Sequence, residues 1–175
     1  VLKDLRLGTW QGKILDYSSI TAYVVGDRVF SAGSRTGGGL VELKADGDAV
    51  TANPIYFTKK VAPGIGGAVL LDGSLYGTSQ QALFCADFAT GEVKWTDRAI
   101  GPASLCYADR RLYVREHSSG DVVLVEPSPD SYKETGRFKQ PDRSKTPAWP
   151  HPVVANGGLY IRDQGVLYCY DVAAK

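Results

Sequence analysis

One short phrase recurs four times along this chain: a polar turn followed by a pair of apolar or aromatic residues. The four copies are "GDRVF" (26–30), "DGSLY" (72–76), "DRRLY" (109–113) and "NGGLY" (156–160). The equivalent positions in these copies are Val29, Leu75, Leu112 and Leu159. They are spaced by 46, 37 and 47 residues, and the mean of about 43 is typical of the blades of a propeller. The chain is therefore predicted to consist of similar units that pack against one another.

Each unit has the chemistry of antiparallel β-strands. Val, Leu, Tyr and Phe dominate the apolar runs, and Asp-Gly, Asn-Gly, Thr-Gly and Asp-Arg pairs separate them at hairpin spacing. No window of 11 or more residues keeps a helical period between its glycines and prolines. We predict an all-β chain forming a single β-propeller domain or half-domain of about four four-stranded antiparallel blades. The expected blades are 20–58, 66–97, 102–138 and 150–175.

The two ends of the chain depart from this pattern. The last unit stops after its third apolar run, "LYCYD" (167–171), whereas "LRLGTW" (5–10) looks like a fourth strand without a blade before it. Residues 1–12 are expected either to close the last blade as its outer strand or to be the remnant of a preceding blade. Trp10 and Trp95 each end an outer strand, where we expect the ring to pack against the neighbouring sheet.

Composition narrows the class of protein. The hydrophobic content of 43% is typical of folded domains, and the net charge of +1 lacks the concentrated positive field that nucleic acid binding requires. No segment reaches the roughly 20 apolar residues of a membrane span. The chain contains no methionine and begins with valine, so we expect a removed leader or a piece of a longer protein. Three widely spaced cysteines are expected to be buried free thiols; they are Cys85, Cys106 and Cys169.

The segment "ALFCADFATGEVKW" (82–95) resembles the repeat of quinoprotein-like, PQQ-binding-like β-propellers, also called BamB-like. The matching positions are Asp87, Thr90, Gly91 and Trp95. Residues 149–172 are similar to the C-terminal blade of secreted members of this group, and the resemblance covers residues 20–175. Such propellers often have seven or eight blades, so the resemblance implies that this chain is the C-terminal half of a ring. It also implies a periplasmic or extracellular location.

The same group contains non-enzymatic scaffolds and quinone-dependent alcohol or sugar dehydrogenases, and the fold does not choose between them. Our leading interpretation is a non-enzymatic module that binds a protein or glycan partner. One alternative is a fragment of a dehydrogenase that uses pyrroloquinoline quinone (PQQ) and calcium. The other alternative is a half-propeller that assembles with a second copy into a homodimer.

Motifs for chemistry are weak. The family's alcohol dehydrogenases stack the quinone on a disulfide between adjacent cysteines, and this chain has no such pair. "KADGDA" (44–49) fits a turn better than a calcium loop, and "GSRTGGG" (33–39) fits a strand connection better than a phosphate loop. His117 and His151 could join a Ser-His-Asp group only if the fold brings partners together. No catalytic residue, metal site or cofactor is predicted.

Strand direction does predict a binding face. In antiparallel blades, the loops between second and third strands emerge on the same face as the loops between blades. Polar residues in these loops would surround the mouth of a central channel, and they are Arg35, Gln80, Arg115, His117, Trp149, His151, Arg162, Asp163 and Gln164. Alternatively, these residues are solvated loop positions, with Arg162 and Asp163 forming a local ion pair. Residues 139–150, with three prolines, are expected to be a blade linker or a recognition loop.

Overall fold

The structure is a computed structural model, and it describes residues 9–10, 13–14 and 22–173. The described part contains strands and no helix. The first large sheet consists of β3 (Tyr23–Val25), β4 (Arg28–Gly33), β5 (Gly37–Asp46) and β6 (Ala49–Thr58). The second consists of β7 (Ala68–Leu71), β8 (Ser74–Thr78), β9 (Leu83–Asp87) and β10 (Val93–Asp97).

The third sheet consists of β11 (Ala103–Ala108), β12 (Arg111–Glu116), β13 (Asp121–Val125) and β14 (Glu134–Lys139). The fourth has three strands, β15 (Val153–Ala155), β16 (Gly158–Asp163) and β17 (Val166–Asp171). Each of these sheets is an antiparallel meander in chain order. The separate pair β1 (Thr9–Trp10) and β2 (Lys13–Ile14) forms a two-stranded sheet.

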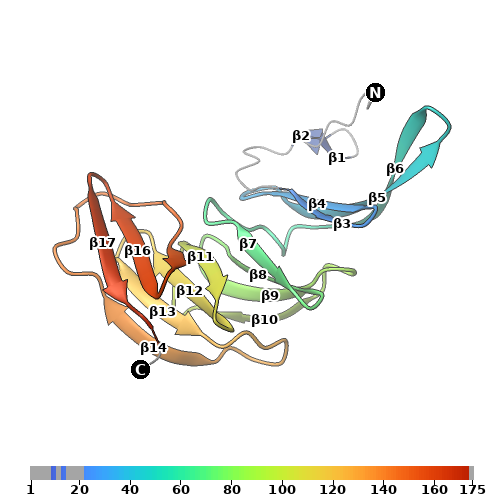
Figure 1. The fold of residues 1–175 in the computed structure, drawn as a ribbon. Helices are drawn as coiled ribbons and strands as arrows, with labels where there is room; N and C mark the ends of the chain where they lie inside the picture. The colour runs from blue at the N-terminus through green and yellow to red at the C-terminus, as the bar shows by residue number, and fades with distance from the viewer. Residues whose placement is uncertain (1–8, 11–12, 15–21, 174–175) are drawn as a thin grey trace.

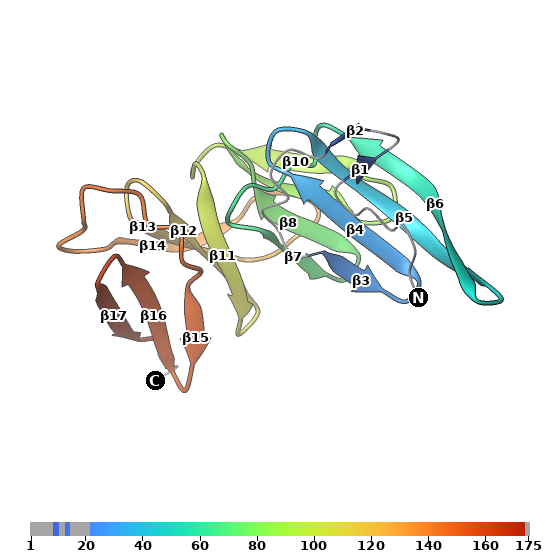
Figure 2. The same ribbon diagram turned by 90° about the horizontal axis from the view of Figure 1, so that it is seen from above.

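The four sheets follow one another through the molecule as the blades of an open arc (Figures 1 and 2). First strands of adjacent sheets contact each other, β7 with β11 and β11 with β15, as expected for strands nearest the axis of a propeller. The first and last sheets do not meet to close a ring (Figure 2). The prediction of an all-β chain built from four-stranded antiparallel units is thus confirmed, with three strands in the last unit.

The recurring Leu-Tyr pair is explained by packing on both faces of each sheet. Successive residues of a strand point to opposite faces, so Leu75 packs in the core between the first and second sheets, while Tyr76 packs in the core between the second and third. Leu112 and Tyr113 repeat this division one sheet further along. In the second and third sheets, one leucine and one tyrosine therefore join the sheet to both of its neighbours.

The polar turns that precede these pairs are two-residue hairpins. In the second, third and fourth copies both turn residues have positive φ, as in type I′ turns: Asp72 (45°) with Gly73 (74°), Asp109 (48°) with Arg110 (60°), and Asn156 (51°) with Gly157 (74°). This turn matches the right-handed twist of the strands it joins. Arg110 is unusual because its position is occupied by glycine in the other two turns.

Replacing Arg110 with glycine is expected to raise the free energy of unfolding by about 0.5–1 kcal/mol. The left-handed φ of 60° brings the Cβ of Arg110 close to backbone atoms, and glycine avoids this cost because it has no Cβ. Glycine also gains more backbone entropy on unfolding, which offsets part of the stabilisation. Denaturant titration of both proteins provides the measurement. Gly73→Ala is the matched opposite change, and it should destabilise because no L-residue favours its φ of 74°.

The family-like segment 82–95 also has a structural explanation. Asp87 Oδ1 accepts hydrogen bonds from the backbone N–H groups of Ala89 and Thr90 and from the Thr90 hydroxyl, which closes the turn between β9 and β10. Trp95 donates its indole N–H to the Ser128 carbonyl at 2.9 Å, and its ring packs between those of Tyr76 and Tyr132. The prediction that Trp95 packs between sheets is confirmed.

The ends and the cysteines differ in part from expectation. Thr9 and Trp10 pair with Ile14 and Lys13, while the rest of 1–12 and the Trp10 side chain lie outside the described residues. The prediction of three buried thiols is wrong for Cys169, which is exposed; Cys106 is half-buried, and Cys85 is buried. Cys169 lies on β17, the outer strand of the last sheet, which pairs only with β16 among the described strands.

Two loop predictions can be compared directly with the strands. "KADGDA" forms the two-residue turn Gly47–Asp48 between β5 and β6, as expected. In "GSRTGGG" the turn occupies 34–36, and the following glycines already belong to β5. A membrane-crossing helix is not found in the part of the chain that the structure describes.

Candidate functional site

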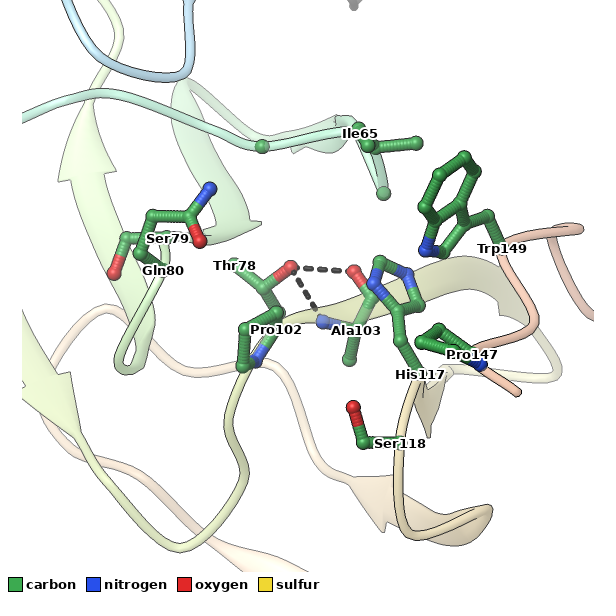
Figure 3. Close-up of a pocket in the computed structure, with 12 residues that line it drawn as sticks. Ile65, Thr78, Ser79, Gln80, Pro102, Ala103, His117, Ser118, Pro147 and Trp149 are labelled. Carbon is green, nitrogen blue, oxygen red and sulfur yellow. Dashed lines mark hydrogen bonds between the residues drawn. The ribbon is translucent and has the colours of Figure 1, made fainter. Parts of the chain in front are cut away.

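Loops from neighbouring sheets surround a hollow of about 220 Å³ (Figure 3). They come from the β6–β7, β8–β9, β10–β11, β12–β13 and β14–β15 connections, the loop types expected to share one face. The lining residues are Gly64, Ile65, Gly66, Thr78, Ser79, Gln80, Pro102, Ala103, His117, Ser118, Pro147 and Trp149. Trp149 and Gln80 lie on opposite sides of the opening (Figure 3). We call this space the first hollow.

A second, more open hollow of about 520 Å³ adjoins the first. It is lined by Pro147, Ala148, Trp149, Pro150, Arg162 and Gln164. Pro147 and Trp149 line both spaces, so the connection from β14 to β15 separates them. Trp149 is 53% exposed. An indole ring thus remains accessible to solvent where the two hollows meet.

Two of the predicted rim residues are instead buried. Arg115 is 0% and Asp163 2% exposed, and Arg115 Nη2 lies 3.6 Å from Asp163 Oδ2. Arg115 also donates to Gln140 Oε1 at 2.7 and 3.1 Å and to the Ala148 carbonyl at 2.7 Å. The expectation of an exposed Arg115 and Asp163 is wrong, because each extends inward at a strand end and meets the other's charge beneath the loops.

Asp163 is satisfied by several further donors. Its Oδ2 accepts from Gln140 Nε2 at 2.9 Å and from the Ser144 N–H at 3.0 Å, and its Oδ1 accepts from the Ser144 hydroxyl. Burial alone raises the pKa of Asp163, but these hydrogen bonds and the Arg115 charge outweigh it, so the pKa is lowered. The β14–β15 connection, expected to be a linker or recognition loop, is therefore anchored to the third and fourth sheets.

A second buried chain of hydrogen bonds supports Trp149 directly. Ser104, fully buried on β11, donates its hydroxyl to the Trp149 carbonyl at 2.7 Å. His117 Nε2 lies 2.9 Å from the same Ser104 oxygen. Because the carbonyl can only accept, the serine proton is directed to Trp149, and His117 Nε2–H is the donor to Ser104. The second ring nitrogen, Nδ1, is then an unprotonated acceptor.

The Ser104–His117 pair is consequently not arranged for nucleophilic catalysis. A nucleophilic serine needs an accessible oxygen and a histidine nitrogen free to take its proton. Ser104 is 0% exposed and gives its proton to a backbone carbonyl. The hydrogen bonds position the Trp149 backbone instead.

Burial lowers the pKa of His117 to about 4; the charges of Arg115 and His151 add to this effect, and Glu116 opposes it. The folded protein therefore keeps His117 neutral where an unfolded chain, with an ordinary histidine pKa of 6.5, binds a proton. We expect the free energy of unfolding to fall by about 2–3 kcal/mol between pH 6.5 and pH 4, from this residue alone. Urea titrations across that range provide the measurement.

His117→Gln is the matched control, since the amide N–H replaces the donor to Ser104 without titrating. The variant should lose much less stability over the same pH range than the wild-type protein. An identical pH dependence in both proteins would contradict a neutral, buried His117. Asp163 does not confound the comparison, because its lowered pKa places its own loss of stability below about pH 4.

The remaining predicted residues divide between the two hollows and other positions. Gln80, His117 and Trp149 line the first hollow, and Arg162 and Gln164 line the second with Trp149. Arg35, in the β4–β5 turn, and His151, whose Nδ1 lies 3.1 Å from the Leu105 carbonyl, line neither. Arg162 donates Nε–H to the Gln164 carbonyl, so the suggested Arg162–Asp163 pair is wrong.

Several residues that shape the site were missed from the sequence. Ser104 and Gln140 carry the buried hydrogen bonds, and Ile65, 42% exposed, faces the first hollow. Ser104 lies within an apolar strand, "SLCYA", and a serine flanked by apolar residues was the one local signal for a buried polar role. Gln140 and Ile65 offer no signal, because they lie in loops between the repeated segments.

A calcium–quinone centre does not fit the residues present. Calcium takes six to eight oxygen ligands, with carboxylates prominent among them. No group of three or more His, Cys, Asp or Glu side chains close enough to hold a metal occurs among the residues described. Asp163, the one buried acidic side chain in the part of the chain that the structure describes, is already occupied by Arg115, Gln140 and Ser144.

Comparison with solved structures agrees with this architecture. BamB from Moraxella catarrhalis aligns with a TM-score of 0.61 and 16% sequence identity, covering 87% of this chain and 42% of BamB. The chain has a β-propeller fold. It spans less than half the length of that propeller. The resemblance inferred from residues 20–175 is thereby confirmed as one of fold.

Two further structures align more weakly. Glutaminyl cyclase from Myxococcus xanthus has a TM-score of 0.43, 19% identity, and coverage of 82% of this propeller chain and 61% of the cyclase. AztD from Citrobacter koseri has a TM-score of 0.40, 12% identity, and coverage of 72% and 47%. No protein-family model and no curated protein sequence matches the chain.

Proposed function

We propose that this propeller is a non-enzymatic module that binds a glycan at the two hollows around Trp149. One observation carries the proposal: a half-exposed indole stands beside a hollow whose lining has no ionised side chain among the described residues. Sugars have both apolar C–H faces and many hydroxyl groups. An aromatic ring beside uncharged donors and acceptors complements both properties.

The first hollow offers hydrogen-bonding groups that the protein leaves unused. Within the described chain, no partner is found for the Gln80 amide, the Ser118 hydroxyl, His117 Nδ1 or Trp149 Nε1. Together they include donors and acceptors, as a ligand with several hydroxyl groups requires. A polar ligand group that pairs with them regains the hydrogen bonds it loses with water.

The site is also rigidly supported. Ser104 holds the Trp149 carbonyl and Arg115 holds the preceding Ala148 carbonyl, both through buried hydrogen bonds. The Thr78 hydroxyl donates a hydrogen bond to the Ala103 carbonyl and accepts one from the Ala103 N–H (Figure 3). These bonds join the second and third sheets at the floor of the first hollow. A binding surface ordered in advance loses less entropy when a ligand binds.

A glycan partner agrees with the periplasmic or extracellular location that the family resemblance implies, and we include that location in the proposal. A protein partner is the competing possibility for the same face. An extended peptide would use the apolar rim of Ile65, Pro147 and Trp149 without needing the unpaired polar groups.

The test is calorimetric titration of the purified chain with neutral hexasaccharides of glucose, mannose and N-acetylglucosamine. We expect at least one to bind, and Trp149→Ala to abolish the binding. Tyr107→Ala is the matched control, because Tyr107 is an aromatic residue of 42% exposure that lines neither hollow. Binding that survives Trp149→Ala, or binding of proline-rich peptides but of no glycan, would contradict the proposal.

A second candidate function is assembly with another copy to complete a ring. The open arc favours it, and so do exposed apolar residues on its two end sheets: Val24 and Val25 on β3, and Val166 and Leu167 on β17. Light scattering should then give a molar mass near twice 18.8 kDa. A mass of 18.8 kDa at micromolar concentration would exclude this candidate.

A further inference from the structure

The two hollows differ in charge. Within the lining that the structure describes, the first hollow has no lysine, arginine, aspartate or glutamate, and burial keeps His117 neutral. The second hollow has one ionised side chain, Arg162. A single ligand that crosses Trp149 would therefore meet an uncharged environment on one side and a positive charge on the other.

The charge of Arg162 is not neutralised locally. Its Nε–H donates to the Gln164 carbonyl at 2.9 Å, and no acid pairs with its guanidinium among the described residues. The adjacent Asp163 extends in the opposite direction, into the buried cluster with Arg115. Both terminal nitrogens of Arg162 are consequently free to donate.

An arginine with two free terminal nitrogens has the geometry to bind a carboxylate through paired hydrogen bonds. Arg162 and Trp149 both line the second hollow. A ligand whose carboxylate binds Arg162 can therefore place its adjoining unit on the indole ring of Trp149. One ligand can reach both subsites, because Pro147 and Trp149 line each of them. The chemistry required is an uncharged ring followed by a carboxylate-bearing unit.

We propose that the ligand is an acidic glycan, with a sugar ring on Trp149 in the first hollow and the carboxylate of a uronic acid on Arg162 in the second. This inference rests on the proposed glycan-binding function and specifies its ligand class. Arg162 supplies selectivity for the charged unit, while Trp149 supplies affinity common to charged and uncharged glycans.

The test compares a hyaluronan hexasaccharide, in which uncharged N-acetylglucosamine units alternate with glucuronic acid units, with the same hexamer in which every carboxylate is a methyl ester. The ester retains the sugar chain and removes the negative charge. We expect the acid to bind about three- to fivefold more tightly than the ester at low salt, as for an exposed charge pair. The difference should shrink at about 0.5 M salt, where screening is strong.

Arg162→Gln should bind the acid and the ester equally, and at the affinity of the wild-type protein for the ester. Arg162 is exposed, so the variant is expected to keep its thermal stability. Lys145→Gln is the matched control, because Lys145 is an exposed cation of the β14–β15 connection that lines neither hollow. It should retain the preference for the acid.

The possible failures can be separated. Equal binding of acid and ester by the wild-type protein, or a preference for acid that persists in Arg162→Gln, overturns the acidic-glycan inference and leaves glycan binding intact. Failure of both hexamers and of all neutral hexasaccharides to bind overturns the glycan function and this inference with it.

Discussion

Asp163→Asn is expected to lower the free energy of unfolding by about 3–5 kcal/mol, since it leaves a buried charge without its counter-charge. Arg115 is fully buried, stays protonated at any physiological pH, and has Asp163 as its ion-pair partner at 3.6 Å. Asparagine keeps the size of the side chain but removes the negative charge. Urea denaturation at pH 7, with circular dichroism as the readout, measures the loss.

Two comparisons distinguish the buried pair from charge loss in general. Glu126→Gln breaks the exposed pair with Lys133 at 2.9 Å and should cost far less stability than Asp163→Asn, because water and salt screen an exposed pair. The double variant Arg115→Met, Asp163→Leu removes both charges, and it should be more stable than Asp163→Asn. If Asp163→Asn unfolds at the same urea concentration as the wild-type protein, the buried pair does not stabilise the anchored connection.

Gly66→Ala is expected to destabilise the protein by about 3 kcal/mol or more, because a Cβ at this position has no space. It would lie 1.7 Å from the Ala103 carbonyl oxygen, 2.5 Å from the Ala103 carbonyl carbon and 2.8 Å from Ser104 Cα. All three are backbone atoms at the start of β11, so no side-chain rotation relieves the overlap. The second and third sheets would have to separate at the floor of the first hollow.

Gly165→Ala is the matched control for this substitution. Gly165 lies in the β16–β17 turn and does not have a positive φ, and a Cβ added there would meet no heavy atom within 4 Å. Its replacement should change the free energy of unfolding by less than about 0.5 kcal/mol. Equal thermal stability of Gly66→Ala and the wild-type protein would show that the two sheets are not in close contact there.

The architecture was predictable because its information is local and repeated. A strand places adjacent residues on opposite faces, so an aliphatic residue followed by an aromatic residue after each two-residue turn already indicates a sheet buried on both sides. The shared face of Gln80, His117 and Trp149 was also predictable, since strand direction alone determines where each loop emerges. Neither argument needs distances between residues far apart in the chain.

The buried cluster was not predictable by the same means. Arg115 and Asp163 each lie at the polar end of a strand, and in sequence they look like ordinary solvated residues. Their connecting partner, Gln140, is 25 residues from Arg115 and 23 from Asp163 and belongs to a segment outside the repeats. Only the packed loops show that these groups meet away from water, where an arginine requires a compensating charge.

The strands, their turns and the face on which the loops gather follow from the order of residues along the chain, because backbone geometry and side-chain alternation act between near neighbours. Tertiary structure alone decided which polar residues are buried as supports and which remain free for a ligand. In the folded protein, Asp163 is buried beside Arg115, whereas Trp149 and Arg162 line the hollows. Whether a polar side chain is buried or accessible depends on the cost of its desolvation, which is set by the whole packed environment of that side chain.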